Sequence, residues 1–172
     1  MRNVMSKVTL IPDKMFNNIY EITPELLKQD GITTVIFDLD NTVAPYSVAY
    51  PTEKMAQYLF SLRDNGINVA FASNNNGKRI EKFNRPLGFF TVCKAKKPSR
   101  RAVRRIMREF GATKAETLVV GDQLFTDCLC AHRAGIRAYI VNPIDPQDEG
   151  WFVKLKRWFE KPHLRYFKRR KA

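Results

Sequence analysis

Asp38 and Asp40 are separated by one residue and stand at the end of an apolar run that closes with Phe37. Asn41 and Thr42 follow them directly. A short run of β-branched and aromatic residues that meets polar residues is typical of a buried strand leading into a loop. Alternation along an extended chain puts both carboxylates on one side, where their charges repel unless a divalent cation or a shared proton intervenes. The pair therefore favours metal-assisted chemistry, and a turn that only caps the next helix is the alternative.

Ser73 and Asn74 follow a second apolar run, residues 67–72, and a helix is predicted from residue 78. Hydroxyl and amide groups that precede a helix can hold an anion such as phosphate, because the first N–H groups of the helix point toward it. A polar hairpin or cap is the alternative interpretation. Asp122 follows a further apolar run in the same way.

Lys97 belongs to a strongly basic segment. Residues 94–108 contain eight lysines and arginines and no acid, which a merely solvated helix does not require. We expect Ser99 to cap a helix here, with one apolar face directed to the core. Arginines occupy the other face, and among them Arg100, Arg101 and Arg104 are predicted to contact an anionic surface.

Five apolar runs alternate with helical segments along the chain. The predicted strands lie in residues 33–41, 67–72, 89–93, 117–120 and 137–141; the predicted helices are a short one capped by Thr23 and others over 52–65, 78–84, 99–111 and 126–134. Residues 1–22 are interpreted as an irregular lead-in on the flank of the domain. Such alternation predicts right-handed βαβ units, hence an α/β fold of three layers, Rossmann-like, with a parallel sheet of about five strands.

The carboxyl ends of parallel strands share one edge of a sheet, and ligands bind there. If the first predicted strand is central, with the second and fourth beside it, Asp38, Asp40 and Asp122 converge with Ser73 and Lys97. An accidental gathering of this kind is improbable, so the sequence predicts a catalytic site at that edge.

The chain has 172 residues and a formal net charge of +13, which suits one domain and polyanionic partners: a phosphorylated substrate, nucleic acid or an anionic membrane face. We expect the domain in residues 1–150 and a basic tail in 151–172, where nine bases face one acid. No apolar run is long enough to span a bilayer.

The tail has the pattern of an amphipathic helix. On a helical wheel its aromatic and apolar residues, Trp151 and Trp158 among them, fill an arc of about 120°, while Lys154, Arg157 and other bases occupy the remainder. This pattern is typical of a helix that lies in a membrane interface. A terminal helix that docks its aromatics on the domain is the alternative.

The three cysteines, Cys93, Cys128 and Cys130, are an odd number in a chain without a secretory apolar segment. This favours reduced thiols and a cytoplasmic protein, with the cysteines as small core residues.

The four groups of polar residues together resemble the ordered motifs of the haloacid dehalogenase (HAD) superfamily of phosphatases. The residues that carry the resemblance are Asp38-Leu39-Asp40-Asn41-Thr42, Ser73-Asn74, Lys97-Pro98 and Gly121-Asp122 with Asp127. Ile11-Pro12-Asp13, Gly31 and Lys96-Lys97-Pro98-Ser99-Arg100-Arg101 are further similar to the YqeG-like branch, which includes the mitochondrial-type phosphatidylglycerophosphate phosphatases.

The resemblance implies a role for each residue. Asp38 is the expected nucleophile, forming an aspartyl-phosphate, and Asp40 the acid that protonates the leaving group and later takes a proton from water. Asp38, the Asp40 carbonyl and Asp122 are the expected ligands of Mg²⁺. Ser73 and the Asn74 amide are expected to hold phosphoryl oxygens beside Lys97. Asp127 is expected to support the site by orienting Lys97 or a metal-bound water.

The resemblance also implies an uncapped site, because neither gap between motifs is long enough for a cap domain. A bulky substrate then has access, and the branch resembled implies phosphatidylglycerophosphate at a membrane surface, with the protein peripherally attached. A nucleic-acid 3′-end phosphatase, a small-molecule phosphatase and a non-catalytic nucleic-acid-binding module are the alternatives.

Overall fold

The central parallel strands form where the sequence is continuously apolar. The computed structural model describes residues 9–147, 158–160 and 162. Its strands are β1 Lys14–Phe16, β2 Thr34–Phe37, β3 Asn68–Ala72, β4 Phe90–Val92, β5 Thr117–Gly121 and β6 Arg137–Val141. They form one sheet in the order β1-β6-β5-β2-β3-β4, and every neighbouring pair is parallel. β2 therefore lies between β3 and β5, which is the strand order that the expected convergence of the acids requires.

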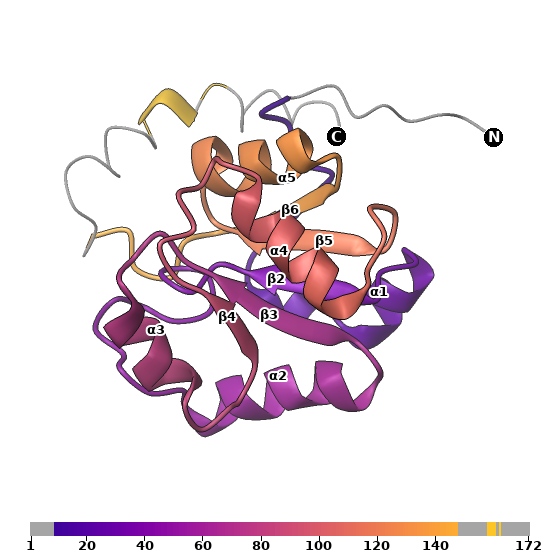
Figure 1. Cartoon of the computed structure of the whole chain (residues 1–172). Coiled ribbons are helices and arrows are strands. Elements are labelled where there is room, and N and C mark those ends of the chain that lie inside the picture. Colours follow the sequence, from indigo (N-terminus) through magenta and orange to yellow (C-terminus); the bar gives the residue numbers. More distant parts are fainter. Residues whose placement is uncertain (1–8, 148–157, 161, 163–172) are drawn as a thin grey trace.

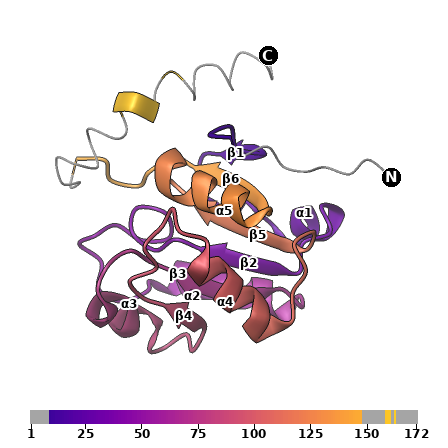
Figure 2. The same ribbon diagram turned by 45° about the horizontal axis from the view of Figure 1, so that its top comes forward.

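Helices cover both faces of this sheet and give the predicted three layers (Figure 1). They are α1 Pro24–Gln29, α2 Glu53–Asp64, α3 Gly77–Asn84, α4 Arg101–Phe110 and α5 Leu129–Ala134, with a short 3-10 helix, η1, at Ile19–Glu21. α2 and α3 lie on one face and α4 and α5 on the other, which the turned view shows as well (Figure 2).

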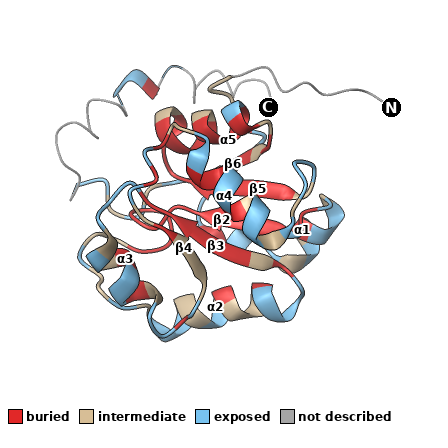
Figure 3. Cartoon of the chain, viewed as in Figure 1, coloured by how far each residue is buried: buried red, intermediate tan, exposed pale blue. Residues whose placement is uncertain are grey.

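Side chains of each strand alternate between two apolar cores, one on each face of the sheet. In β2, Val35 and Phe37 pack into the core beneath α2 and α3, while Ile36 packs into the core beneath α4 and α5. Strands β2, β3, β5 and β6 are almost wholly buried, and the edge strands β1 and β4 are mostly half-buried. The exposed residues lie mainly on the outer helix faces and in loops (Figure 3). Burial on both faces explains why the strands are continuously apolar rather than alternating.

The predicted helix starts are confirmed at Thr23 and Thr52, whose hydroxyls accept hydrogen bonds from Leu26 N and Met55 N. Two other predicted boundaries differ from the structure. The N-cap position of α4 is Arg100, one residue later than predicted, and the Ser99 hydroxyl accepts a hydrogen bond from Arg101 N at 3.4 Å. The predicted helix over 126–134 begins earlier, as a π-helix, η2, over Leu124–Cys128.

The lead-in is more regular than predicted, because residues 14–16 form β1, which makes the sheet six-stranded. β1 pairs with β6 at the sheet edge, with Met15 opposite Ile140. The run of alternating residues that forms β1 is too short to stand out in the sequence, and its pairing with a distant strand is what stabilises it.

The chain between β2 and α2, and between β3 and β4, contains no inserted domain: all of these residues are described, and they form a loop and α3. Within the described ranges no helix is both long and apolar enough to cross a bilayer. The expected tail contacts Trp151, Lys154 and Arg157 lie outside the described residues.

Candidate active site

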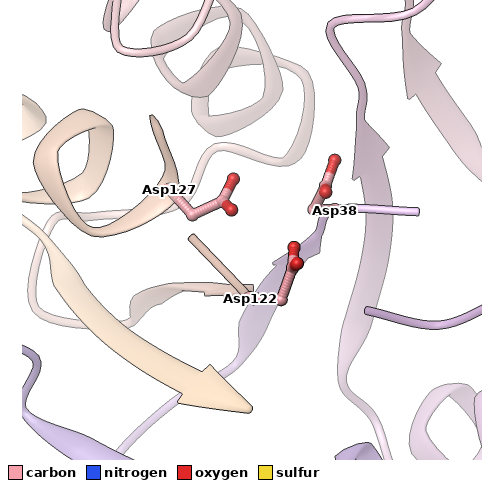
Figure 4. A group of neighbouring side chains, drawn as sticks. All are labelled: Asp38, Asp122 and Asp127. Atoms are coloured by element: carbon pink, nitrogen blue, oxygen red, sulfur yellow. The ribbon is translucent and has the colours of Figure 1, made fainter. Parts of the chain in front are cut away.

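Three carboxylates meet at the carboxyl edge of the sheet (Figure 4). Asp38 follows β2, Asp122 follows β5 and Asp127 lies in η2. One oxygen of each lies within 4.8 Å of the others, and all three residues are buried. Parallel strands bring Asp38 and Asp122 together across more than 80 positions of sequence, as predicted. The third acid of the cluster is Asp127, whereas the prediction placed Asp40 there.

Lys97 neutralises part of this charge. Its Nζ donates hydrogen bonds to Asp38 Oδ1 at 2.6 Å and to Asp127 Oδ1 at 2.7 Å. Burial by itself lowers the pKa of Lys97, but the carboxylates of Asp127 and Asp38 outweigh it and hold that pKa above its usual range. Lys97 is therefore a buried, protonated ammonium group.

The charge around Lys97 remains unbalanced. Burial raises the pKa of Asp38 well above its usual value; Lys97 opposes this rise, while Asp127 and Asp122 add to it. Three carboxylates around one ammonium sum to two negative charges when ionised. Clustered carboxylate oxygens are the donors that Mg²⁺ prefers, and a divalent cation would balance that charge. The donor set therefore fits a hard divalent metal ion.

Local hydrogen bonds fix the two carboxylates that follow β5. The Asp122 carboxylate accepts a hydrogen bond from Thr42 Oγ1 at 3.0 Å, which joins the loop after β2 to the end of β5. The Asp127 carboxylate accepts from Gln123 N at 3.2 Å and from Thr126 Oγ1 at 3.3 Å. These hydrogen bonds orient the Asp122 and Asp127 carboxylates without a bound ligand.

Asp40 faces a different cation from Asp38. Its Oδ1 accepts a hydrogen bond from Arg79 Nε at 2.5 Å. Its Oδ2 accepts from Asn75 Nδ2 at 2.5 Å and from Ser73 Oγ at 3.5 Å. The Asp40 carboxylate is not part of the three-carboxylate cluster; the ligand role expected of it concerned its main-chain carbonyl and stays a prediction.

Asn74 joins the two loops that were expected to bind phosphate. Its Oδ1 accepts from Lys97 N at 2.7 Å, and its Nδ2 donates to Lys97 O at 3.1 Å. The side chain therefore fixes the main chain that carries Lys97, a role that sequence reasoning missed. Ser73 lies beside it and accepts a hydrogen bond from Asn75 N at 3.1 Å.

A small pocket opens between these groups, with a volume of about 180 Å³. Its lining includes Asp38, Asp40, Ser73, Asn74, Asn75 and Lys97. Tyr46, in the loop after β2, also lines it. The five residues predicted at the pocket surface therefore gather there, while Asp122 and Asp127 belong to the carboxylate cluster and do not line the pocket. Asn75 lies in the polar turn predicted to face an anion, without a role of its own. Tyr46 and Arg79 carry no motif signal and were not predicted.

The other predicted contacts do not line this pocket. Arg100, Arg101 and Arg104 are exposed at and beyond the start of α4. Cys128 and Cys130 are buried and Cys93 is half-buried, and all three are free thiols. Burial raises the pKa of the Cys128 and Cys130 thiols, the latter to about 12, which agrees with their expected role as core residues.

Comparison with known proteins gives two sequence relatives of interest. The model of the family "haloacid dehalogenase-like hydrolase" matches residues 45–135. The chain is 35% identical to "Probable phosphatase YqeG" of Bacillus subtilis (strain 168) over 96% of each chain. It is 28% identical to "Phosphatidylglycerophosphate phosphatase 1, chloroplastic/mitochondrial" of Arabidopsis thaliana, over 92% of this chain but only 51% of that protein.

Two solved structures share the fold at low sequence identity. A hypothetical protein of Xanthomonas campestris superposes with a TM-score of 0.56 at 21% identity, covering 81% of this chain and 79% of that one. The cobalt-bound deoxy-D-mannose-octulosonate 8-phosphate phosphatase of Haemophilus influenzae gives a TM-score of 0.52 at 15% identity, covering 79% and 91%.

Proposed function

The chain belongs to the haloacid dehalogenase-like hydrolases and is a phosphatase of that family, and from this premise we propose that it is a Mg²⁺-dependent phosphomonoesterase that acts on phosphatidylglycerophosphate. The observation that carries the catalytic part is the arrangement around Lys97. One ammonium group contacts Asp38 and Asp127, and Asp122 completes the cluster, at the wall of a pocket that Ser73 also lines.

Asp38 attacks phosphorus in the proposed reaction, and the bond to the leaving oxygen breaks as the aspartyl-phosphate forms. Asp40 gives its proton to that oxygen, so the product leaves as a neutral alcohol. Water then attacks the phosphoryl group and loses a proton to Asp40, which releases phosphate and restores both carboxyl groups. Lys97 and the Ser73 hydroxyl are placed to offset charge on the phosphoryl oxygens.

Asp38 and Asp122 would hold Mg²⁺, with Asp127 close enough to bind it directly or through water. When bound, the ion supplies a positive charge that lowers the repulsion between the Asp38 carboxylate and an anionic phosphate. With all three carboxylates ionised, Lys97 alone leaves two negative charges in the cluster, so the residues by themselves oppose an incoming phosphate.

Three observations support a lipid substrate. The Arabidopsis thaliana relative bears the name of a phosphatidylglycerophosphate phosphatase. No inserted domain covers the pocket in the described chain, so a bulky headgroup has access. Arg100, Arg101 and Arg104 are exposed next to the Lys97 loop, where each can add about 1 kcal/mol of attraction to an anionic membrane.

The described part of the tail supports attachment of the protein at a membrane face. Residues 158–160 are helical, and the Glu160 side chain is buried, accepting a hydrogen bond from Phe125 N in η2 at 3.0 Å. Trp158 and Phe159 are 62% and 52% exposed, with their rings 4.9 Å apart. The acid of this segment thus faces the domain, while much of each aromatic ring stays accessible for a lipid interface.

The catalytic part is tested by phosphate release from an aryl phosphate. We expect turnover with Mg²⁺, loss of turnover after chelation, and a loss of at least about 10³-fold in Asp38→Asn. Asp64→Asn is the matched control, because Asp64 is an exposed acid at the end of α2. Turnover that survives in Asp38→Asn would contradict the nucleophile assignment.

The substrate is tested by a paired comparison at equal enzyme concentration. Phosphatidylglycerophosphate in mixed micelles should release phosphate faster than a 3′-phosphorylated oligonucleotide. Faster release from the oligonucleotide would replace the lipid proposal with a nucleic-acid end phosphatase, whereas turnover of the aryl phosphate alone would leave only a small-molecule phosphatase.

A further inference from the structure

Arg79 binds the carboxylate of Asp40 and the loop that follows β2 at the same time. Its Nε donates to Asp40 Oδ1 at 2.5 Å. Its Nη1 donates to Val48 O at 2.8 Å, and its Nη2 donates to Pro45 O at 2.6 Å. All three nitrogens of one guanidinium group are therefore used, and the group joins α3 to both ends of a four-residue stretch of the loop.

The two oxygens of Asp40 have different surroundings. Oδ2 contacts Ser73 and Asn75, which line the pocket. Oδ1 contacts Arg79, which does not line it, and the Arg79 side chain is only 19% exposed. Arg79 thus holds one oxygen of Asp40, while the other oxygen contacts two side chains that line the pocket.

We infer that Arg79 is a positioning residue for Asp40: it fixes the carboxyl group and its loop so that Oδ2 meets the leaving oxygen of the substrate. The inference rests on the proposed function, because it assumes that Asp40 transfers a proton there. A guanidinium group suits this task better than an ammonium group, since its planar fork makes several directed hydrogen bonds at once.

Such a role has a kinetic signature that a purely structural contact lacks. An alkyl phosphate expels a strongly basic alkoxide, so cleavage of its P–O bond needs the proton from Asp40. An aryl phosphate expels a weakly basic phenolate, which leaves without that proton. Loss of a group that acts through Asp40 therefore slows alkyl phosphates far more than aryl phosphates.

The experiment measures kcat/KM of the full chain with Mg²⁺ on p-nitrophenyl phosphate and on glycerol 3-phosphate. In Arg79→Gln we expect a loss of about 100-fold on the alkyl ester and less than about 3-fold on the aryl ester. Arg79→Lys should recover part of the alkyl activity, because the charge is kept and the fork is lost. Lys78→Gln is the matched control: it removes one exposed positive charge from the same helix and should change neither value.

A double-mutant cycle separates action through Asp40 from other effects. Arg79→Gln should add less than about 2-fold to the alkyl-ester loss of Asp40→Asn. An equal loss on both esters in Arg79→Gln, or a full additional loss in the Asp40→Asn background, would overturn the inference and leave the proposed function intact. A wild-type protein inactive on both esters would overturn the proposed function and this inference with it.

Discussion

The Cα of Gly121 lies so close to the Asp127 side chain that no larger residue fits at position 121. A Cβ built there would lie 2.2 Å from Asp127 Cγ and 2.4 Å from Asp127 Oδ2. Gly121 is the last residue of β5 and Asp127 belongs to η2, so the approach packs the π-helix directly on the end of the strand. Glycine is required at position 121 because a side chain has no room there. The backbone of Gly121 is not in the left-handed region of φ, so conformation alone would admit another residue.

Gly121→Ala should therefore disable the site. Relief of the clash requires a shift of more than 1 Å in Asp127, and a displacement of that size in an active site costs about 100-fold in rate. We expect turnover of an aryl phosphate to fall by about that factor and Mg²⁺ affinity, measured by calorimetry, to fall with it. Gly77→Ala is the control, because its Cβ would clash only with the flexible end of Glu81 and would meet Cys93 Sγ at an ordinary contact distance of 3.6 Å. Unchanged turnover in Gly121→Ala would show that Asp127 is dispensable.

Lys97 should contribute to folding as well as to catalysis. Lys97→Met leaves the buried carboxylates of Asp38 and Asp127 without their ammonium partner, and breaking a buried pair in this way costs about 3–5 kcal/mol. We expect that loss in the free energy of unfolding in urea, with metal chelated. Adding Asp127→Asn should restore part of it, whereas the exposed neighbour substitution Lys96→Met should have little effect. No recovery in the double variant would argue against charge as the cause.

Asn74 should act through the main chain of Lys97. Asn74→Ala removes two hydrogen bonds, each worth about 1 kcal/mol, and frees the loop that carries the ammonium group. We expect a fall of about 10-fold in kcat/KM and a lower melting temperature. Asn76→Ala is a close control, because the Asn76 side chain makes no capping hydrogen bond to α3. Equal effects at both positions would mean that the hydrogen bonds of the Asn74 side chain to Lys97 are not the cause of the loss.

His132, which packs at the edge of the sheet, should make the free energy of unfolding depend on pH. Its Nδ1 lies 2.7 Å from Thr9 O and its Nε2 lies 3.3 Å from Asp13 Oδ2, so both ring nitrogens face acceptors and the ring is an imidazolium. Burial lowers the pKa of His132, but the hydrogen bond to Asp13 and other contacts outweigh it and raise that pKa to about 10.

The folded-state pKa of His132 lies above its unfolded value of 6.5, so the protonated ring stabilises the fold fully below about pH 6.5. That contribution is lost as pH rises toward about 10. The difference in unfolding free energy between wild type and His132→Gln should therefore shrink between about pH 6 and pH 10, and Asp13→Asn should flatten the dependence. A difference that stays constant across this range would contradict the assignment.

The fold was largely predictable, because it follows from interactions between residues close in sequence. Continuous apolar runs mark strands that are buried on both faces, and Thr23 and Thr52 cap helices through hydrogen bonds that span three residues. β1 escaped prediction because three half-buried residues carry little local signal. The π-helix was not predicted because it begins at Leu124, before the predicted start at Thr126, and no side-chain cap marks that position.

The sequence by itself determined which side chains could do chemistry and that they would share one edge, since strand order and the parallel direction fix where Asp38, Ser73 and Asp122 emerge. The tertiary structure alone decided how they are paired. Asp38 forms an ion pair with Lys97 and Asp40 forms one with Arg79, although the two acids are separated by one residue. Such pairing depends on where loops far apart in the sequence meet, to within an ångström, and residue spacing along the chain does not carry that information.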